Sequence, residues 1–279
     1  MRWRGGRRSM FIDDRRGRTA KRAAGGIGGI VLIGAIVIAL LGGDPTVLLD
    51  AVEQGGTITT TERVPTPAED EQAEFVSVVL ADTEDTWHAL FQQAGEQYQE
   101  PTLTLFSGAV DSACGFNTAA TGPFYCPGDQ RVYLDLEFFQ QLESLGAPGD
   151  FARAYVIGHE VGHHVQNLTG VLGAVQREQS ASPGSANALQ VRVELQADCY
   201  AGVWAHHADR QRDLLEAGDV EEGLQAAAAI GDDTLQRRAG RAVRPESFTH
   251  GSAAQRAQWF RTGFSSGDVA ACDTFGGAG

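Results

Sequence analysis

The sequence of 279 residues predicts an α+β fold in which short strands come first and helices follow. Two segments alternate between apolar and polar residues as strands do, TLTLFSG at 102–108 and RVYLDL at 131–136. Downstream of them, apolar residues recur every three or four positions, which is typical of helices. We expect these helices at 137–145, 150–168, 187–209 and 219–230. A chain of this length can bury a sizeable core.

The folded body is expected to begin with a further helix near Phe75. In the stretch EFVSVVLADTEDTWHALFQQAG, apolar residues recur at helical spacing, and Trp87, Leu90 and Phe91 are expected to face the core. Residues 44–74, which precede this helix, are rich in Thr, Pro, Gly and acidic side chains. That composition predicts a solvated linker between the body and the N-terminal part of the chain.

Charge is distributed unevenly along the chain, whose formal net charge is −14. Residues 1–22 carry nine Arg and Lys side chains against Asp13 and Asp14, whereas the rest of the chain carries 13 basic and 34 acidic residues. A basic head on an acidic body indicates a polar arrangement of the two parts. Because the acidic body would repel phosphates, we do not expect it to bind nucleic acid.

Residues 23–43 form a run of 21 residues without a charge, which is long enough to cross about 30 Å of hydrocarbon as a helix. The basic residues before the run are expected to stay in the cytoplasm, which places the body on the other side of the cell membrane. A cleaved signal peptide is the alternative, but its basic region would be unusually long, and LLGGDP is a poor cleavage site. We therefore predict a single-pass membrane protein with a cytoplasmic N-terminus and an extracytoplasmic body.

All four cysteines follow this predicted span, on the side where disulfides persist. From the sequence alone, three pairings are open. The short loop CGFNTAATGPFYC makes Cys114–Cys126 the natural local bridge, which leaves Cys199 for Cys272. A zinc cluster is the alternative, and the absence of any C-x-x-C pair disfavours it.

The stretch VIGHEVGHHVQNLTG, which starts at Val156, contains the residues expected to carry chemistry. His159 and His163 are four residues apart and lie about 40° apart on one helix face, and Glu160 flanks that face. This is the H-E-x-x-H arrangement, in which two imidazoles hold zinc and the glutamate acts on water as a general base. His164 is expected to point away from the metal and to serve in packing or hydrogen bonding.

A catalytic zinc normally has three protein ligands, and the third is expected from VELQADCYAGVWAHHA. Glu194 and Asp198 are four residues apart on one predicted helix. We predict Glu194 as the metal ligand and Asp198 as the group that accepts a hydrogen bond from a ligating imidazole. An acid pair on a solvated helix face is the alternative, but the apolar neighbours leave little polar face for it. His206 and His207, three turns further along this helix, are rival ligands.

A polarised carbonyl oxygen needs a second donor as negative charge develops on it. His250, in the stretch SFTHGS, is predicted to be this catalytic donor, and an ordinary loop or helix-capping histidine is the alternative. Tyr133 or Tyr155 could serve in its place. The strand at 131–136 is expected to be an edge along which an extended peptide docks.

Several stretches of the chain resemble the bacterial family of putative neutral zinc metallopeptidases. They are GHEVGHHVQNLTGV, RVELQADCYAGVWAHHA, GPFYCPGDQRVYLDL, SFTHGSAAQRAQWFRTGFSSGD, CDTF and the basic opening MRWRGGRRSMFIDDRRG, which one span follows. The resemblance covers nearly the whole chain except the 44–74 linker. It implies a membrane-anchored, zincin-like peptidase that binds one Zn2+ per chain through His159, His163 and Glu194, with Glu160 as the catalytic base.

The predicted organisation is a basic cytoplasmic segment at 1–22, a transmembrane helix at 23–43, a linker at 44–74 and a zinc metallopeptidase domain at 75–279. The predicted function is zinc-dependent hydrolysis of peptide bonds in a peptide or protein substrate. Two alternatives stay open, a catalytically silent zinc-containing domain that binds a partner peptide and a zinc amidase that acts on cell-wall material. Glu160 favours an enzyme, because a structural zinc site is usually closed by four protein ligands.

Overall fold

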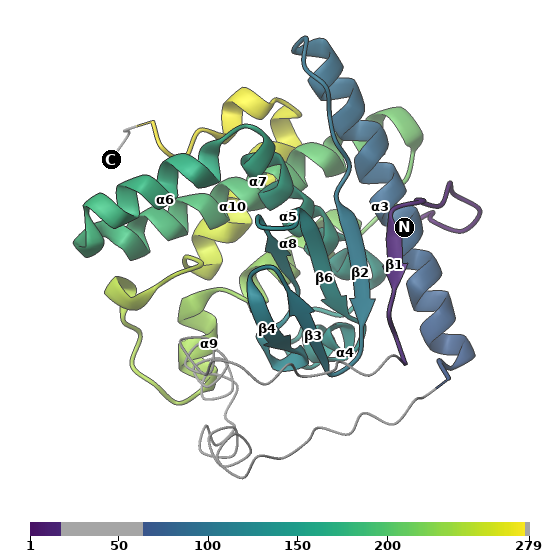
Figure 1. Ribbon diagram of the computed structural model, residues 1–279, viewed down its shortest axis with the longest axis horizontal. Helices are drawn as coiled ribbons and strands as arrows, with labels where there is room; N and C mark the ends of the chain where they lie inside the picture. The colour runs from purple at the N-terminus through teal and green to yellow at the C-terminus, as the bar shows by residue number, and fades with distance from the viewer. Residues whose placement is uncertain (18–63, 277–279) are drawn as a thin grey trace.

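The structure is a computed structural model that describes residues 1–17 and 64–276. The β part of the molecule is built mainly on parallel strand pairing. The main sheet has the strand order β1-β2-β6-β5, in which β1, β2 and β6 run parallel and β5 is antiparallel to β6. A hairpin of β3 and β4 accompanies it (Figure 1). The strands are β1 (Ile12–Asp14), β2 (Thr102–Phe106), β3 (Ala109–Ser112), β4 (Gly115–Thr118), β5 (Phe124–Cys126) and β6 (Arg131–Asp135).

Most of the helices follow the strands in the chain, so the α+β class predicted from the sequence is confirmed. The four downstream helices that were expected are α4, α5, α7 and α8, whereas α6, α9 and α10 were not expected. The helices are α3 (Pro67–Gln93), α4 (Glu137–Ser144), α5 (Asp150–Leu168), α6 (Val171–Ala181), α7 (Ala186–Arg212), α8 (Asp219–Ala229), α9 (Asp232–Arg238) and α10 (Ala253–Ser266). Short 3-10 turns are η1 (Ala119–Thr121), η2 (Pro183–Ser185), η3 (Pro245–Ser247) and η4 (Val269–Cys272).

Helix α3 begins earlier than the sequence suggested. Pro67 occupies its first turn, where a missing amide hydrogen costs nothing, and Thr66 forms a capping box with Glu69. The helix therefore begins two turns before Phe75, and those two turns belong to the body rather than to the predicted linker. The rest of that linker, residues 44–63, lies outside the described residues.

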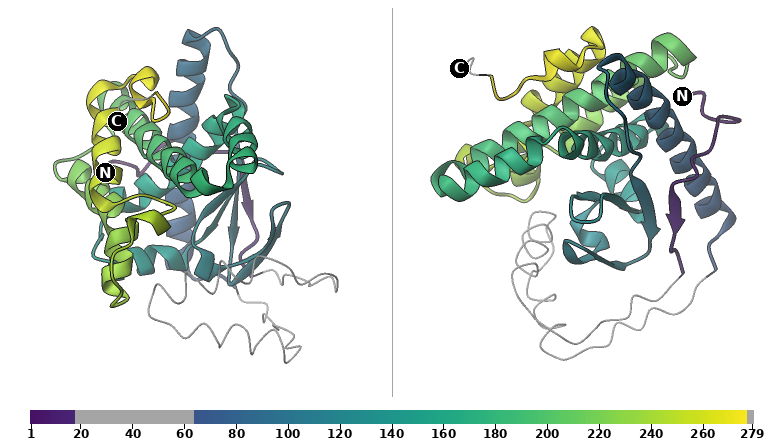
Figure 2. Two further views of the ribbon diagram at one scale, coloured as in Figure 1. Left: turned by 90° about the vertical axis from the view of Figure 1, so that its left-hand side faces the viewer. Right: turned by 45° about the horizontal axis from the view of Figure 1, so that its top comes forward.

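Residues 1–17 are part of the folded body. β1 pairs in parallel with β2, so that Ile12 lies opposite Leu103. Upstream of this strand, the ring of Trp3 is buried and packs edge-on against Phe75 of α3, with ring centroids 5.3 Å apart. Figure 1 and Figure 2 show β1 beside β2 and α3. The basic segment at the start of the chain therefore packs on the α+β core.

The arginines of this segment pair with acidic side chains of α3. The pairs are Arg4–Glu71, Arg7–Glu84, Arg8–Glu74 and Arg16–Asp70. Most of these side chains are exposed, and an exposed ion pair contributes only about 0–1 kcal/mol. Strand pairing and the burial of Trp3 therefore hold the segment more firmly than its charges do. The uneven charge of the sequence marks a contact between two parts of one body.

This arrangement contradicts two predictions, the transmembrane helix and the single-pass location in a membrane. The predicted span at 23–43 lies outside the described residues, and none of the helices within 1–17 and 64–276 combines the length and apolar character needed to cross a bilayer. A single crossing between β1 and α3 would also place these elements on opposite sides of a membrane, whereas both pack into one body. The sequence misled because the basic residues before the charge-free run have partners on α3.

Glycines let the helices around the candidate site approach one another closely. A Cβ atom at Gly162 of α5 would lie 2.9 Å from the carbonyl oxygen of Ala197 on α7. A Cβ atom at Gly263 of α10 would lie 1.9 Å from the carbonyl oxygen of Cys199, also on α7. Within a helix, glycine costs about 1 kcal/mol relative to alanine. Here the lack of a side chain at Gly162 and Gly263 lets α5 and α10 pack directly on the backbone of α7.

Two disulfides are present, in the pairing that the sequence suggested. Cys114–Cys126 joins the β3–β4 hairpin to β5, with a Cα–Cα distance of 5.8 Å. Cys199–Cys272 joins α7 to η4, with a Cα–Cα distance of 5.6 Å. Both distances lie in the usual range for a disulfide. The second bond holds the end of the described chain against the helix that carries Glu194.

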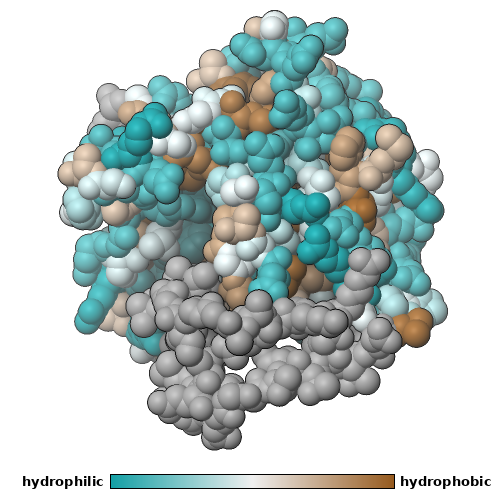
Figure 3. Space-filling model, in the orientation of Figure 1, coloured by the Kyte–Doolittle hydropathy of each residue, from teal (hydrophilic) through white to brown (hydrophobic). Residues whose placement is uncertain are grey.

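The core lies between the sheet and helices α3, α5 and α7. Its largest fully buried side chains include Trp87 of α3, Phe151 of α5 and Trp204 of α7. The rings of Phe151 and Trp204 stack with their centroids 5.9 Å apart. The face shown in Figure 3 is mostly hydrophilic, with apolar residues in scattered groups. Burial of the apolar faces of α3, α5 and α7 thus fixes the framework on which the candidate site is built.

Candidate metal centre

Two helices bring three candidate ligands together. His159 and His163 come from one face of α5, with ring centroids 4.7 Å apart, and Glu194 comes from α7. The Oε2 atom of Glu194 lies 3.2 Å from Nε2 of His159 and 3.5 Å from Nε2 of His163. One ligand atom of each residue lies within 4.8 Å of the other two. The structure thus brings the three residues predicted as zinc ligands to one point.

These three atoms fit a tetrahedral zinc ion. Ligand atoms about 2.05 Å from zinc are separated by about 3.3 Å along a tetrahedral edge, and both distances above are close to that value. Two imidazoles and one carboxylate are also a donor set of catalytic zinc sites, which keep the fourth position open. Because donor chemistry and spacing agree, these residues would hold zinc.

Asp198, predicted as the partner of a ligating imidazole, lies behind His159. Its Oδ1 atom is 2.8 Å from Nδ1 of His159. Arg256 of α10 donates to both oxygens of the same carboxylate, each at 2.9 Å. The hydroxyl group of Tyr155 also donates to Oδ1 of Asp198. All four residues are buried, so they form a network that holds the imidazole in one orientation.

The other two candidate ligands have amide partners. Gln166 Oε1 lies 2.9 Å from Nδ1 of His163, three residues earlier on α5. Gln190 donates to Oε1 of Glu194 at 2.9 Å, one turn earlier on α7. The Nδ1 atoms of both histidines are thus engaged, and their Nε2 atoms face the free oxygen of Glu194.

Burial and charge act against each other at these groups. Burial favours neutral carboxyl groups, but the charge of Arg256 and then that of His159 outweigh it and lower the pKa of Asp198. For Glu194 the nearby charge of His163 outweighs burial and holds the pKa well below its usual range. Burial also opposes a charge on His159, but without a bound cation the two carboxylates raise its pKa to about 9. Metal binding must therefore displace a proton from this site.

Glu160, the predicted base, is buried beside His159 in the middle of α5. Successive helix residues are about 100° apart, so its side chain flanks the face that carries the ligands. Within residues 1–17 and 64–276, no side chain donates a hydrogen bond to its carboxylate. The carboxylate of Glu160 therefore has no side-chain donor among the described residues.

His250, the predicted donor, lies in the loop before α10, with about half of its side chain exposed. Asp232, the first residue of α9, holds this loop. Its Oδ2 atom accepts the backbone N–H groups of Thr249 (2.7 Å), His250 (2.7 Å) and Gly251 (3.0 Å). Its Oδ1 atom lies 3.3 Å from Nδ1 of His250. The position of His250 thus depends on one buried carboxylate.

The rival ligands are engaged elsewhere. Nδ1 of His206 lies 2.7 Å from the carbonyl oxygen of Phe264, and Nε2 of His207 lies 3.0 Å from that of Gly267. Both acceptors lie at the C-terminal end of α10. These two histidines therefore join α7 to α10 and do not reach the three candidate ligands.

His164 points away from the ligands, as expected for a packing or hydrogen-bonding histidine. Its two ring nitrogens lie 3.0 Å from the hydroxyl group of Tyr125 and 2.6 Å from the carbonyl oxygen of Gln99. Tyr133 donates to Asp129, and its ring is buried in the sheet. Tyr155 supports Asp198, as described above. Neither tyrosine is therefore placed as the second donor at the candidate site.

The strand expected to receive a peptide is not an edge. β6 lies between β2 and β5, so both of its sides are already paired. Among the described strands the edge on that side of the main sheet is β5, whose Tyr125 hydroxyl group accepts a hydrogen bond from Asn167 of α5. The position of a strand within a sheet depends on long-range pairing, which the alternation of side chains in one strand does not reveal.

Sequence reasoning missed Arg256, Gln166 and Asp232. The signal for Arg256 was a charged residue with apolar neighbours in AAQRAQWF, but no helix was predicted there. Gln166 sits three residues after His163, the usual spacing for contact on a helix. Asp232 begins a short helix far from His250 in the chain. Only the folded chain shows that these residues meet the candidate site.

Comparison with known proteins agrees with this geometry. A family model described as "Putative neutral zinc metallopeptidase" matches residues 1–275. The uncharacterized protein YpfJ of Escherichia coli strain K12 is 46% identical over 288 residues, with 99% of each chain covered. The uncharacterized protein Rv2575 of Mycobacterium tuberculosis strain H37Rv is 44% identical over 217 residues, covering 73% of this chain and 72% of its own. No solved structure matches the chain.

Proposed function

The chain belongs to the family described as putative neutral zinc metallopeptidase, and from this premise we propose that it hydrolyses peptide bonds with one zinc ion held by His159, His163 and Glu194. The observation that carries the proposal is the spacing of the three ligand atoms, which matches a tetrahedral site with one open position. Glu160, which follows His159 on α5 and accepts no side-chain hydrogen bond from the described residues, supports hydrolysis rather than a structural role.

The chemistry divides between the ion and the side chains. Zinc, when bound, polarises a carbonyl group and lowers the pKa of a water to about 7. Glu160 takes the proton from this water and later transfers it to the leaving amine. Asp198 and Gln166 keep the two imidazoles turned towards the site, because each accepts a hydrogen bond from an Nδ1 atom.

His250 is proposed as the donor to the carbonyl oxygen as it becomes negative. Because Nδ1 of His250 faces Asp232, its Nε2 atom is the one left to reach the substrate. Asp232 is ionised and buried, so it favours the protonated ring that such a donor needs. Loss of one donor of this kind typically lowers kcat about 100- to 1,000-fold.

An extended peptide is proposed to pair with β5. This strand is the edge of the main sheet on the side of β6, and Tyr125 connects it to α5 through Asn167. Strand addition uses the backbone of a peptide, so it would give affinity for an extended peptide with little dependence on its side chains.

The test separates metal binding from catalysis. The full chain, loaded with zinc, is incubated with a library of quenched fluorescent peptides. Glu160→Gln keeps the shape of the site but cannot take the proton, so zinc stays near one per chain while hydrolysis falls about 100- to 10,000-fold. Glu194→Ala removes an anionic ligand and loses zinc on dialysis. Glu221→Gln, an exposed change on α8, is the matched control and should leave both quantities unchanged.

Two results would contradict these roles. One is equal loss of zinc from Glu160→Gln and Glu194→Ala, and the other is full hydrolysis by Glu160→Gln. Retention of zinc together with peptide binding but no cleavage would instead support a silent binding domain. Release of fragments from cell-wall material, with no cleavage of any peptide, would support a zinc amidase.

A further inference from the structure

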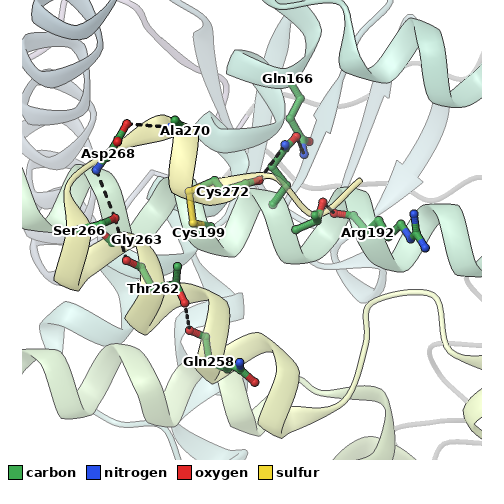
Figure 4. Close-up of a disulfide and its surroundings, with 12 residues drawn as sticks. Gln166, Arg192, Cys199, Gln258, Thr262, Gly263, Ser266, Asp268, Ala270 and Cys272 are labelled. Carbon is green, nitrogen blue, oxygen red and sulfur yellow. Dashed lines mark hydrogen bonds between the residues drawn. A yellow bond between two sulfur atoms is a disulfide. The ribbon is translucent and has the colours of Figure 1, made fainter. Parts of the chain in front are cut away.

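A chain of hydrogen bonds, buried except at its last member, runs from the Cys199–Cys272 disulfide to His163. Nε2 of Gln196 donates to the carbonyl oxygen of Cys272 at 3.0 Å. Nε2 of Gln166 donates to Oε1 of Gln196 at 3.0 Å, and Oε1 of Gln166 faces Nδ1 of His163 at 2.9 Å. Figure 4 shows the Cys199–Cys272 disulfide, with Gln166 among the labelled residues around it.

The direction of every bond in this chain is determined by two backbone carbonyl groups. The carbonyl of Cys272 can only accept, so the amide of Gln196 must turn its NH2 group towards it. The carbonyl of Val193, which is 2.8 Å from Nε2 of Gln166, fixes the second amide in the same way. Oε1 of Gln166 therefore has to accept, and His163 has to donate through Nδ1.

A histidine that donates through Nδ1 keeps the lone pair of its neutral ring on Nε2. In His163 this is the atom 3.5 Å from Glu194, at the candidate metal centre. Gln166 is completely buried and Gln196 is nearly so, which means that water does not compete for the bonds of these two amides with each other and with the two carbonyl groups. The network thus selects the ring form and the orientation that a metal ion requires.

The two histidines differ in this respect. The imidazole of His159 is held by the Asp198 carboxylate, which Arg256 keeps charged. The Nδ1 atom of His163 is held by the neutral amide of Gln166. That amide is anchored by the carbonyl of Val193 and, through Gln196, by the carbonyl of Cys272. Hydrogen bonds between neutral groups are weaker than hydrogen bonds to charged groups. The orientation of His163 therefore depends more on each supporting hydrogen bond than that of His159 does.

We propose that Gln166 and Gln196 are positioning residues for His163, and that the Cys199–Cys272 disulfide acts on the metal centre through them. This inference rests on the zinc site of the proposed function. The disulfide holds η4 on α7, and with it the carbonyl group that starts the chain. When this bond is absent, the Cys272 carbonyl is held less firmly and Gln196 loses its anchor. The amide of Gln166 is then oriented mainly by the carbonyl of Val193, and the preference for the Nδ1–H form of His163 is weaker.

The test uses the full chain and two measurements that do not require hydrolysis. The first is the zinc dissociation constant from competition with a chromophoric chelator. Gln166→Leu and Gln196→Leu should each weaken zinc binding about 10- to 100-fold, the usual effect of losing a partner of a metal-binding histidine. Gln176→Leu, an exposed change on α6, is the matched control and should bind zinc as the unaltered chain does.

A double-mutant cycle tests the role of the disulfide. Replacing Cys199 and Cys272 by alanine should weaken zinc binding in the unaltered chain but add little in the Gln166→Leu background. Replacing Cys114 and Cys126 by alanine, the other disulfide, should leave zinc affinity unchanged in both backgrounds. Full additivity of the Cys199/Cys272 and Gln166 changes would show that the bond does not act through the glutamines.

The second measurement is the nitrogen-15 spectrum of the His163 ring in the metal-free chain, at a pH high enough that the ring is neutral. The unaltered chain should show a proton on Nδ1, and Gln166→Leu or loss of the Cys199–Cys272 bond should give a mixture of ring forms. Zinc binding by Gln166→Leu equal to that of the unaltered chain, or an unchanged ring form in this variant, would overturn the inference. If Gln166→Leu does not fold, Gln196→Leu decides the same question.

These measurements also separate this inference from the proposed function. A chain that binds no zinc would contradict the proposed function, while the ring spectrum would still decide whether the glutamines position His163. A chain that binds zinc but cleaves nothing leaves the affinity test fully applicable, and its result then supports or overturns the inference by itself.

Discussion

Arg256 of α10 and Asp198 of α7 form a completely buried ion pair, in which two guanidinium nitrogens each donate to one carboxylate oxygen at 2.9 Å. The pair lies directly behind His159, whose Nδ1 atom is 2.8 Å from the same carboxylate. A helix near the C-terminal end of the described chain therefore controls the charge of the group that orients a candidate metal ligand.

Arg256→Met should damage both stability and metal binding. The substitution leaves the Asp198 carboxylate buried without its main positive partner, and breaking a buried pair in this way typically costs about 3–5 kcal/mol of unfolding free energy. Zinc affinity should fall about 10- to 100-fold, because Asp198, the partner of His159, loses the arginine that keeps it charged and in position. Chemical denaturation and chelator competition measure the two effects. Arg261→Met, an exposed change on the same helix, should alter neither.

Asp232→Asn should lower turnover without loss of zinc. The amide cannot favour a protonated His250, so we expect kcat to fall about 100-fold or more while zinc content stays near one per chain. Asp233→Asn is the matched control, because Asp233 caps α10 through Ala253 and does not contact His250. An unchanged kcat in Asp232→Asn would contradict the role of this pair.

The same carboxylate should contribute to acid sensitivity. Burial alone would raise the pKa of Asp232, but the hydrogen bond and charge of His250 and the backbone N–H groups of this loop outweigh it, and the pKa is lowered. A group with a lowered folded pKa stabilises the protein above its unfolded pKa of about 4, and this stabilisation is lost as the pH falls further. Asp232→Asn should therefore reduce the unfolding free energy at pH 7, and the difference should shrink below about pH 4. A difference that grows towards low pH would show the opposite sign.

Gly162→Ala should separate the two helices that carry the ligands. Its new methyl group would lie 2.9 Å from the carbonyl oxygen of Ala197, so α5 and α7 would have to move apart. We expect an unfolding free energy lower by about 1–3 kcal/mol, the usual cost of overpacking, together with weaker zinc binding. Gly173→Ala in α6 meets only the end of the flexible Arg177 side chain and should stabilise the chain by up to about 1 kcal/mol.

Trp3→Ala should destabilise the body, because residues 1–17 are part of it. The ring of Trp3 is 9% exposed and packs on Phe75, and loss of a buried tryptophan costs about 3–5 kcal/mol. Thermal unfolding of the full chain measures the effect. Met10→Ala, in the same segment but 90% exposed, should change the melting temperature little. Equal melting temperatures of the two variants would show that the segment is not docked.

The features that the sequence alone determined are local ones. The expected helix bounds agree with α4, α5, α7 and α8 because the apolar face of a helix repeats within each turn. His159 and His163 could be assigned to one site because four residues are about one helical turn. The third candidate ligand, Glu194, could also be identified from the sequence, since a pair of acids in an otherwise apolar helix needs a partner for burial. In each case the necessary information lies within a few consecutive residues.

Tertiary structure alone decided the relationships between distant segments. The charge-free run at 23–43 suggested a membrane crossing, yet β1 before it and α3 after it belong to one body. Likewise, the residues near Arg256 in the chain do not predict its pairing with Asp198. Those near Gln166 do not predict its link to Cys272 through Gln196. Strand order and side-chain partners depend on which surfaces meet when the core is buried. That outcome is set by the packing of the whole chain, and no local pattern contains it.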